Sequence, residues 1–301
     1  ERDLADLDKD RRLRRAVADA EAGQTGLACM DAWAEELVDT GYLHNHARMW
    51  FASIWIFTLG LPWRLGADFF LRHLVDGDPA SNTLGWRWVA GLHTRGKPYV
   101  AQASNIARFT EDRFMPRAQE LTQSASGLEA LEPGGLPECK APRVPNAPQL
   151  HLPTALLLTE EDCRIEDFPF QDLICTAAAT LAASPLRSPR EVAQLVVRFE
   201  AGALADVAQR SGLAVSAMQI GAPSDLARWA LQSGAQQIVT PYVPVGPLRD
   251  WLARAQPELQ AAGISLTEWR RDWDAMIWPH ATAGFFKVKK QIPKFLRTIC
   301  A

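Results

Sequence analysis

The pattern of apolar and polar positions divides the chain into a helical first part and a second part in which strands and helices alternate. Before about residue 150, apolar residues recur at helical spacing and no alternating strand pattern is present. The spacing predicts helices over residues 4–22, 29–39, 43–60 and 66–75, and a further helix that holds Trp86 and Trp88. We therefore expect the first part to be entirely α-helical.

In the second part, strand and helix patterns alternate. Short apolar runs predict strands over residues 155–158, 214–220, 237–240 and 264–266, and helical patterns cover residues 189–199, 202–211, 224–233 and 247–262. This alternation is typical of an α/β domain with a parallel sheet. Neither a Gly-x-Gly-x-x-Gly pattern nor a Walker pattern is present, so the sequence predicts no particular ligand for this domain.

Between the two parts, residues 115–153 hold seven prolines among Gly, Ser, Glu and Ala. That composition is typical of an extended linker. The predicted organisation is therefore a helical domain over residues 1–114, a linker over 115–153, and an α/β, Rossmann-like domain over 154–301.

Composition and charge narrow the class of protein. The chain has 301 residues, is 48% hydrophobic and carries a formal net charge of -3, so any contact with nucleic acid needs a local basic surface. The longest apolar run, Trp50 to Trp63, is too short and interrupted to span a bilayer. The N-terminal residues are densely charged, unlike a signal peptide. We expect a cytoplasmic monomer that does not bind membranes.

The five cysteines follow no metal-binding or disulfide pattern. Their number is odd, and no Cys-x-x-Cys pair or Cys/His spacing is present. We interpret them as reduced thiols and expect no zinc or other metal site.

Residues 41–90 hold the chemistry-bearing side chains. Arg48 lies beside Trp50 and Phe51, which indicates a buried position, and a buried arginine needs a carboxylate partner. Asp76 and Asp78 in the following loop are the nearest candidates. Each residue alone has a simpler interpretation, a solvated helix end for Arg48 and an Asx-turn for the aspartates. The set together favours a binding site.

Tryptophan is unusually frequent, with 11 residues in the chain. Trp86 and Trp88 are two apart, so in a helix they face different directions. These two indoles and Trp63 either pack in the hydrophobic core or lie next to a redox group. Indoles beside Asp, Asn and His predict a buried aromatic redox cofactor.

The same stretch resembles the DNA photolyase/cryptochrome family. The motifs are Gly23-Gln24-Thr25-Gly26, Met30-Asp31-Ala32, Thr40-Gly41-Tyr42-Leu43-His44-Asn45 and Gly85-Trp86-Arg87-Trp88. They cover about 75 residues and match the latter part of the family's helical FAD-binding domain. The resemblance implies an FAD cofactor and a flavoprotein lyase that repairs cyclobutane pyrimidine dimers in UV-damaged DNA by light-driven electron transfer.

The resemblance also implies roles for individual residues near the flavin. Arg48 and Asp76 would form an ion pair near the isoalloxazine, Asn82 would face its N5, and Asp78 would hold its polar edge. Asn45 and Trp86 would also contact the cofactor.

Further roles concern electron transfer and the substrate. Trp86 would be the tryptophan closest to the flavin and Trp63 the middle one, while the outer position falls near Asp10. The residues that match contacts to the flipped dimer are Trp88, Met49, Asn45 and, in place of the usual arginine, His46. The (6-4) repair branch has histidines at positions 45 and 49, so Asn45 and Met49 favour the cyclobutane type of site.

Two departures from the family keep alternatives open. The upstream segment that holds the FAD phosphates is missing, and an α/β region follows the helical domain instead of preceding it, so we expect a fragment or truncated gene product. A cryptochrome-like blue-light photosensor without repair activity, or a helical protein without catalysis, would also carry these motifs. The sequence identifies no second, antenna chromophore. The basic residues Arg87, Arg95, Lys97, Arg108 and Arg113 are either phosphate contacts or a solvated face.

Overall fold

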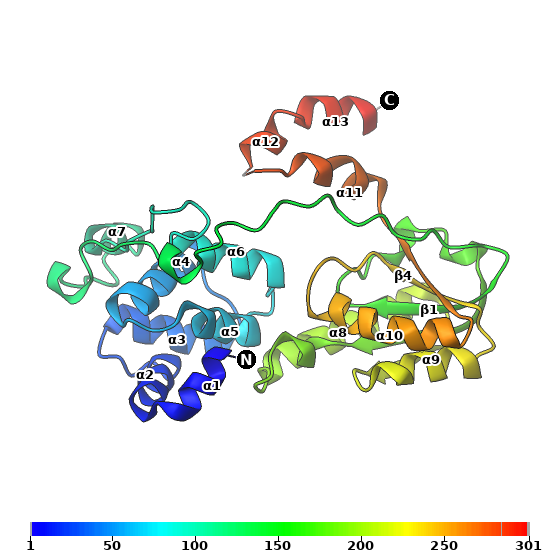
Figure 1. The fold of residues 1–301 in the computed structure, drawn as a ribbon, viewed down its shortest axis with the longest axis horizontal. Helices are drawn as coiled ribbons and strands as arrows, with labels where there is room; N and C mark the ends of the chain where they lie inside the picture. The colour runs from blue at the N-terminus through cyan, green and yellow to red at the C-terminus, as the bar shows by residue number, and fades with distance from the viewer. Residues whose placement is uncertain (1, 284, 300–301) are drawn as a thin grey trace. The chain divides into compact units, whose positions relative to one another are not determined.

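The computed structural model describes residues 2–283 and 285–299. Its contacts divide the chain into two compact units (Figure 1). We call residues Glu1–Pro137 and Ser184–Phe199 the helical unit, and residues Glu138–Ala183 and Glu200–Ala301 the sheet unit. The segment Ser184–Phe199 thus lies with the helices, although the sequence pattern groups it with the α/β domain.

The helical unit contains helices joined by short turns. The α-helices are α1 (Arg2–Lys9), α2 (Arg11–Glu21), α3 (Ala28–Thr40), α4 (Asn45–Ser53), α5 (Trp63–His73), α6 (Pro79–Val89) and α7 (Ala103–Phe109). A π-helical turn, Ile54–Thr58, continues α4, and 3₁₀ turns lie at Ala118–Glu120, Glu129–Leu131 and Ser184–Arg187. No strand interrupts this order in the described part of the unit, as the sequence pattern predicts.

Local side chains set the helix boundaries. Asp10 splits the single helix predicted over residues 4–22, because its carboxylate accepts hydrogen bonds from the backbone N–H groups of Arg12 and Leu13 and caps α2. Gly41 ends α3 with φ of 68°, a left-handed conformation that glycine adopts without strain. Both residues therefore mark helix boundaries that hydrophobic spacing alone does not reveal.

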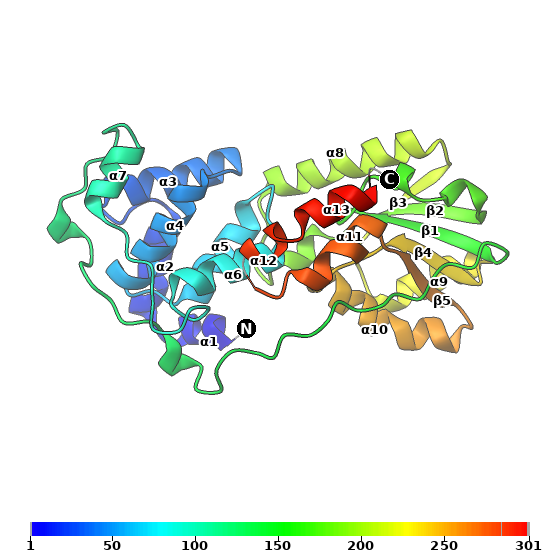
Figure 2. The same ribbon diagram turned by 90° about the horizontal axis from the view of Figure 1, so that it is seen from above.

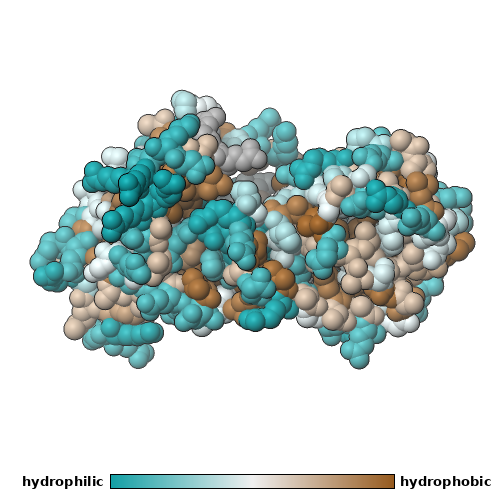
Figure 3. All heavy atoms as spheres, turned by 90° about the horizontal axis from the view of Figure 1, so that it is seen from below, coloured by the Kyte–Doolittle hydropathy of each residue, from teal (hydrophilic) through white to brown (hydrophobic). Residues whose placement is uncertain are grey.

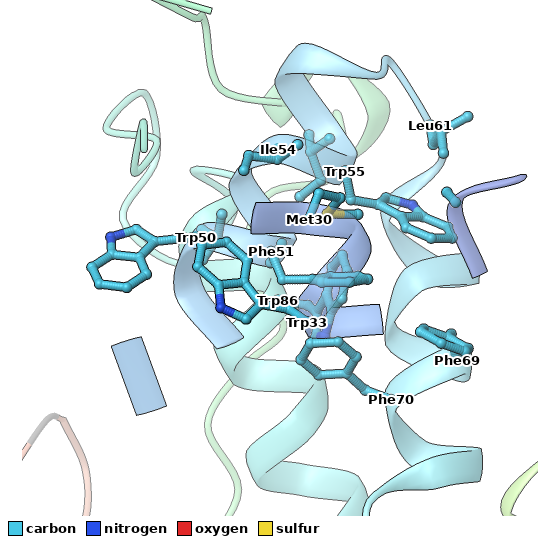
Figure 4. Close-up of a cluster of buried hydrophobic side chains, with 14 of the residues drawn as sticks. Met30, Trp33, Trp50, Phe51, Ile54, Trp55, Leu61, Phe69, Phe70 and Trp86 are labelled. Atoms are coloured by element: carbon cyan, nitrogen blue, oxygen red, sulfur yellow. The ribbon is translucent and has the colours of Figure 1, made fainter. Parts of the chain in front are cut away.

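The core of the helical unit is aromatic. Figure 4 shows Phe51 and Trp55 near Phe69, Phe70 and Trp86. Trp55 is 0% exposed, and its ring centre lies 6.2 Å from that of Trp86 in an edge-to-face arrangement. Because α5 and α6 both contribute to this cluster, its packing fixes the two ends of the loop that joins these helices.

The sheet unit is built on five parallel strands. They are β1 (Pro153–Thr159), β2 (Ile174–Ala182), β3 (Val215–Gln219), β4 (Gln237–Pro241) and β5 (Ser265–Trp269), in the order β3-β2-β1-β4-β5. Four of them match predicted strands. The sequence pattern missed β2, because its residues are mostly Ala and Thr, and alanine is a poor strand former.

The helices of the sheet unit cover both faces of this sheet. They are the C-terminal part of α8 (Gln194–Ser211), α9 (Pro223–Gln232) and α10 (Pro247–Ala261). Figure 2 shows α8 on one face and α9 and α10 on the other, as right-handed crossovers to either side of β1 require. The two helices predicted over 189–199 and 202–211 are one continuous helix.

After β5 the chain forms α11 (Asp272–Ile277), a 3₁₀ turn (Trp278–His280), α12 (Phe286–Lys289) and α13 (Ile292–Ile299). On the face of the molecule in Figure 3, hydrophilic residues are interspersed with apolar ones. None of the helices in the described ranges has the length and apolar character needed to cross a membrane.

The remaining sequence features concern thiols and metals. Cys29, Cys139, Cys163 and Cys175 are free thiols, and Cys300 lies outside the described residues. Burial raises the pKa of the Cys29 thiol to about 11, so this side chain is not a reactive thiolate at neutral pH. Among the described residues no group of three or more His, Cys, Asp or Glu side chains has the arrangement of a metal site.

Candidate functional site

A cavity of about 280 Å³ lies in the helical unit between α4, the end of α5 and α6. Eight of the ten side chains that the sequence singles out line it. They are Asn45, Arg48, Met49, Asp76, Asp78, Asn82, Trp86 and Trp88. The structure therefore brings together residues that are up to 43 positions apart in the sequence.

Arg48 and Asp76 form the ion pair that the sequence predicts. The Nη2 of Arg48 donates to both carboxylate oxygens, at 3.1 and 2.8 Å, and its Nε donates to the carbonyl oxygen of Leu43 at 2.8 Å. The side chain of Arg48 is 26% exposed and that of Asp76 is 51% exposed. The pair is therefore held in one geometry but remains accessible to a ligand in the cavity.

Asp78 and Asn82 are fixed by the start of α6. The Oδ1 of Asp78 accepts a hydrogen bond from the N–H of Ser81 at 2.6 Å and caps the helix, so the local-turn interpretation of this aspartate is correct for one oxygen. One turn later, the Nδ2 of Asn82 donates to the carbonyl oxygen of Ala67 on α5 at 2.8 Å. This bond sets the side-chain orientation, with the amide nitrogen toward α5.

Trp86 forms an inner wall of the cavity. It is 2% exposed and packs edge-to-face on Phe70, with ring centres 5.1 Å apart. Its Nε1 is buried and has no hydrogen-bond partner among the described residues. The indole therefore offers the cavity an apolar aromatic surface.

Trp88 and Asn45 are exposed residues of the lining. Trp88 is 39% exposed and stacks on Tyr99 with ring centres 5.2 Å apart. Asn45 is exposed at the first position of α4, and Met49 is half-buried one turn further on. These three residues offer a stacking surface, an amide and an apolar side chain beside the ion pair.

Two predicted site residues lie outside the cavity lining. Trp63 is 6% exposed at the start of α5, where the guanidinium groups of Arg64 and Arg87 lie 5.1 and 6.0 Å from its ring. His46 is half-buried and stacks between Trp50 and Phe109, at ring distances of 5.6 and 5.2 Å. Neither side chain contributes to the cavity wall in this structure.

The basic residues after the loop make different contacts. Arg87 makes two hydrogen bonds of 2.7 Å with the carboxylate of Glu132, and these hold the pKa of Glu132 below its usual range. The guanidinium groups of Arg108 and Arg113 stack over the neighbouring rings of Phe109 and Phe114. Arg87 is thus committed to an ion pair, which removes it from the candidate phosphate contacts.

Residues 3–117 match the family model described as the FAD binding domain of DNA photolyase. The matched residues all lie in the helical unit. Over 77 residues the chain is 48% identical to a deoxyribodipyrimidine photo-lyase of Streptomyces griseus, covering 26% of this chain and 17% of that protein.

Other photo-lyases give the same picture. The Escherichia coli (strain K12) enzyme is 42% identical over 77 residues, covering 26% of this chain and 16% of that enzyme. The Agrobacterium fabrum enzyme is 37% identical over 107 residues, covering 33% and 22% of the two proteins. The chain thus spans about a sixth to a fifth of the length of the curated relatives it matches. No solved structure is significantly similar to the chain.

The photolyase domain binds FAD, and the residues present fit one part of that cofactor. Ligand pockets usually measure ~300–1,000 Å³, so a cavity of about 280 Å³ has room for a ring system but not for a whole dinucleotide. An ion pair, an oriented amide and a buried indole match the mixed polar and aromatic character of an isoalloxazine ring.

Sequence reasoning missed several contributors to the site. The apolar lining residues Ala52, Phe70 and Leu74 look like ordinary core positions in the sequence. Gly66 was also missed, although Trp86 lies against it: a Cβ at this glycine would be 2.2 Å from Cη2 of Trp86. The only sequence signal for it is a glycine inside a helical pattern, which indicates a close approach of some kind.

Proposed function

We propose that the cavity in the helical unit binds the isoalloxazine ring of FAD, and that the protein takes part in light-driven repair of cyclobutane pyrimidine dimers in DNA. The observation that carries this proposal is the convergence of Arg48, Asp76, Asn82 and Trp86 on one cavity. The resemblance to photolyases implies a place beside the flavin for the same residues. The similarity to photo-lyases over residues 3–117 supports the same assignment.

FAD, when bound, supplies the group that absorbs light and passes an electron to the dimer. The protein supplies position and charge. Arg48 places a cation beside the ring site, and Asp76 holds that cation by its two oxygens. A fixed cation stabilises negative charge that develops on a neighbouring ring, because it needs no reorganisation.

Asn82 and Trp86 shape the other sides of the ring site. The bond from Asn82 to Ala67 fixes the amide, which leaves its side-chain oxygen as an oriented acceptor. Trp86 excludes water on the core side and lies next to Trp55 and Phe70, so its indole is in contact with a continuous aromatic cluster. An electron donor in such a position is shielded from solvent.

The dimer site of the proposal uses Trp88, Met49 and Asn45. A dimer inside a duplex is out of reach, and photolyases are among the enzymes that take the target base out of the stack. The exposed face of Trp88, stacked on Tyr99, offers an aromatic platform for a splayed base. Asn45 and Met49 offer a polar and an apolar contact on the neighbouring helix.

A repair assay tests this function. The purified chain is incubated with FAD and a UV-irradiated oligonucleotide, and the loss of dimers is followed under blue light and in the dark. We expect loss of dimers in the light only, and a strong reduction when Trp88→Ala removes the platform. Dimers that persist equally in light and darkness, with FAD bound, would exclude repair.

A cryptochrome-like photosensor is the second candidate. His46 is stacked between two aromatic rings, so it is not presented to phosphates as an arginine at this position would be. Asp10, at the position of the outer tryptophan, caps α2. Flavin that responds to light, without preferential binding of dimer-containing DNA, would favour this second function.

A further inference from the structure

The segment Ser184–Phe199 leaves the sheet after β2 and packs on the helical unit before it returns as α8. Nothing in the proposed function uses this segment. The segment makes side-chain and backbone contacts with α5 and with the turn that follows α5. These contacts lie beside the loop Leu74–Asp78, which carries Asp76 and Asp78 and leads into α6.

A buried ion network joins the segment to the helical unit. Arg190 makes two hydrogen bonds with Glu21, at 2.6 and 2.8 Å, and Ser188 donates to Asp68 at 2.6 Å. Arg72, whose side chain is 7% exposed, donates to both of these carboxylates, at 2.9 and 2.8 Å. Two arginines and two carboxylates thus neutralise one another, and removing one would leave a buried charge without its partner.

Backbone hydrogen bonds and close packing also join the segment Ser184–Phe199 to the rest of the helical unit. The N–H of Ala193 donates to the carbonyl oxygen of Arg72 at 3.0 Å. Leu195 packs so close to Gly41 that a Cβ on this glycine would lie 2.9 Å from the leucine side chain. The carbonyl oxygen of Gly41 accepts the N–H of Val75 at 2.9 Å. The segment therefore contacts both chain stretches that hold the start of the loop.

Arg187 makes the contact nearest to the cavity. Its Nη1 donates to the carbonyl oxygen of Leu74 at 3.0 Å, and the same oxygen accepts the N–H of Gly77 at 3.1 Å. A Cβ on Gly77 would lie 3.0 Å from Nη1 of Arg187, so the guanidinium rests against the backbone of the loop. Gly77 lies between Asp76 and Asp78, and both of these line the cavity.

We propose that Ser184–Phe199 holds the loop Leu74–Asp78 in position beside the cavity, with Arg187 as the positioning residue. Arg187 fixes the carbonyl of Leu74, and the turn from Leu74 to Gly77 then keeps Asp76 within hydrogen-bond distance of Arg48. The inference rests on the proposed function for the identity of the ligand, but the ordering of the loop by Arg187 is a property of the protein without ligand.

The test is the variant Arg187→Met, which keeps the length of the side chain and removes its donors. Hydrogen exchange is measured on the full chain without ligand. We expect the amides of Gly77, Ser81 and Asn82 to exchange about tenfold faster, because a hydrogen bond from a charged donor is lost, while α2 and α3 exchange at the original rate. Arg187→Lys, which restores one charged donor, should recover part of the protection.

The same experiment also measures FAD affinity, and it includes a control variant at an arginine outside the segment. Arg117→Met removes an exposed arginine that pairs with Glu120 elsewhere in the helical unit, and it should leave loop exchange and FAD affinity unchanged. Arg187→Met should weaken FAD binding by about tenfold. Loop exchange that stays at the wild-type rate in Arg187→Met, or that rises equally in Arg117→Met, overturns the proposal. Faster loop exchange in a chain that binds no FAD would support the positioning role and contradict the flavin function.

Discussion

Gly66 of α5 and Trp86 of α6 fit against each other without space for another atom: a Cβ at position 66 would lie 2.2 Å from Cη2 of Trp86 and 3.0 Å from Cε2 of Trp55. The indole of Trp86 forms a wall of the cavity, so the absence of a side chain at position 66 determines where that wall lies. This close approach explains a glycine in the interior of a helix, where it otherwise costs stability.

The first prediction follows from this contact. Gly66→Ala should lower the free energy of unfolding by about 1–3 kcal/mol, because the new methyl group displaces buried rings. Gly85→Ala on α6 is the control, since a Cβ there meets nothing within 4 Å, and it should stabilise the helix by roughly 0.5–1 kcal/mol. Urea denaturation measures both. A Gly66→Ala protein as stable as the wild type would contradict the packing described here.

The second prediction concerns the ion pair at the cavity. Arg48→Gln should change the free energy of unfolding by no more than about 1 kcal/mol, because Arg48 and Asp76 are partly solvated. The same variant should weaken FAD binding by roughly tenfold or more, because a charged donor at the ring site is lost. Flavin fluorescence quenching gives the affinity and thermal unfolding gives the stability. Equal affinity in the two proteins would remove Arg48 from the cofactor site.

The third prediction concerns the orientation of Asn82. Asn82→Asp replaces the amide donor by a carboxylate oxygen that would face the carbonyl of Ala67, so the free energy of unfolding should fall by about 1–3 kcal/mol. Asn105→Asp makes the same chemical change in the first turn of α7, where negative charge is favourable, and should be neutral or slightly stabilising. If both variants unfold at the same urea concentration as the wild type, the bond to Ala67 does not hold Asn82.

The fourth prediction is a pH dependence that arises at His73. The pKa of His73 is lowered to about 4, first by burial and then by the neighbouring charges of Arg72 and Arg190, while the carboxylates of Glu21 and Asp68 act in the opposite direction. The unfolded chain takes up this proton near pH 6.5 and the folded chain only near pH 4, so this contribution to stability is complete above pH 6.5 and declines as the pH falls toward 4.

His73→Phe tests that dependence. Between pH 7 and pH 5 the wild type should lose about 2 kcal/mol of stability through this one group, and the variant should lose correspondingly less. His93→Gln, at an exposed histidine, should keep the wild-type dependence. Urea midpoints at the two pH values give the comparison. Parallel losses in His73→Phe and the wild type would show that His73 is not the responsible group.

The sequence predicts the fold well where spacing and composition agree. The helices around Trp33, Trp86 and Trp229 and the apolar strand at Leu156–Leu158 follow directly from their periodicity. The sequence pattern does not predict the strand Ile174–Ala182, because its alanines are poor strand formers and are held there by pairing with the neighbouring strands. The packing of Ser184–Phe199 on the helical unit depends on an ion pair and a hydrogen bond between residues more than 100 positions apart, which no local pattern encodes.

The candidate site likewise contains some residues that the sequence identifies and others that it does not. The resemblance to photolyases named side chains whose identity is tied to chemistry, and eight of them line one cavity. It could not reveal supporting groups such as the Leu43 carbonyl that orients Arg48, because every residue has a carbonyl. Trp63 and His46 lie away from the lining, and their roles in electron transfer and in substrate binding stay predictions.

The most direct test of the flavin site is the visible absorption spectrum of the purified chain after incubation with FAD and gel filtration, recorded before and after blue light. We predict that flavin bands remain with the protein and bleach on illumination, and that Arg48→Gln retains less flavin. A protein that elutes without flavin bands, although folded, would contradict the assignment of the cavity to FAD.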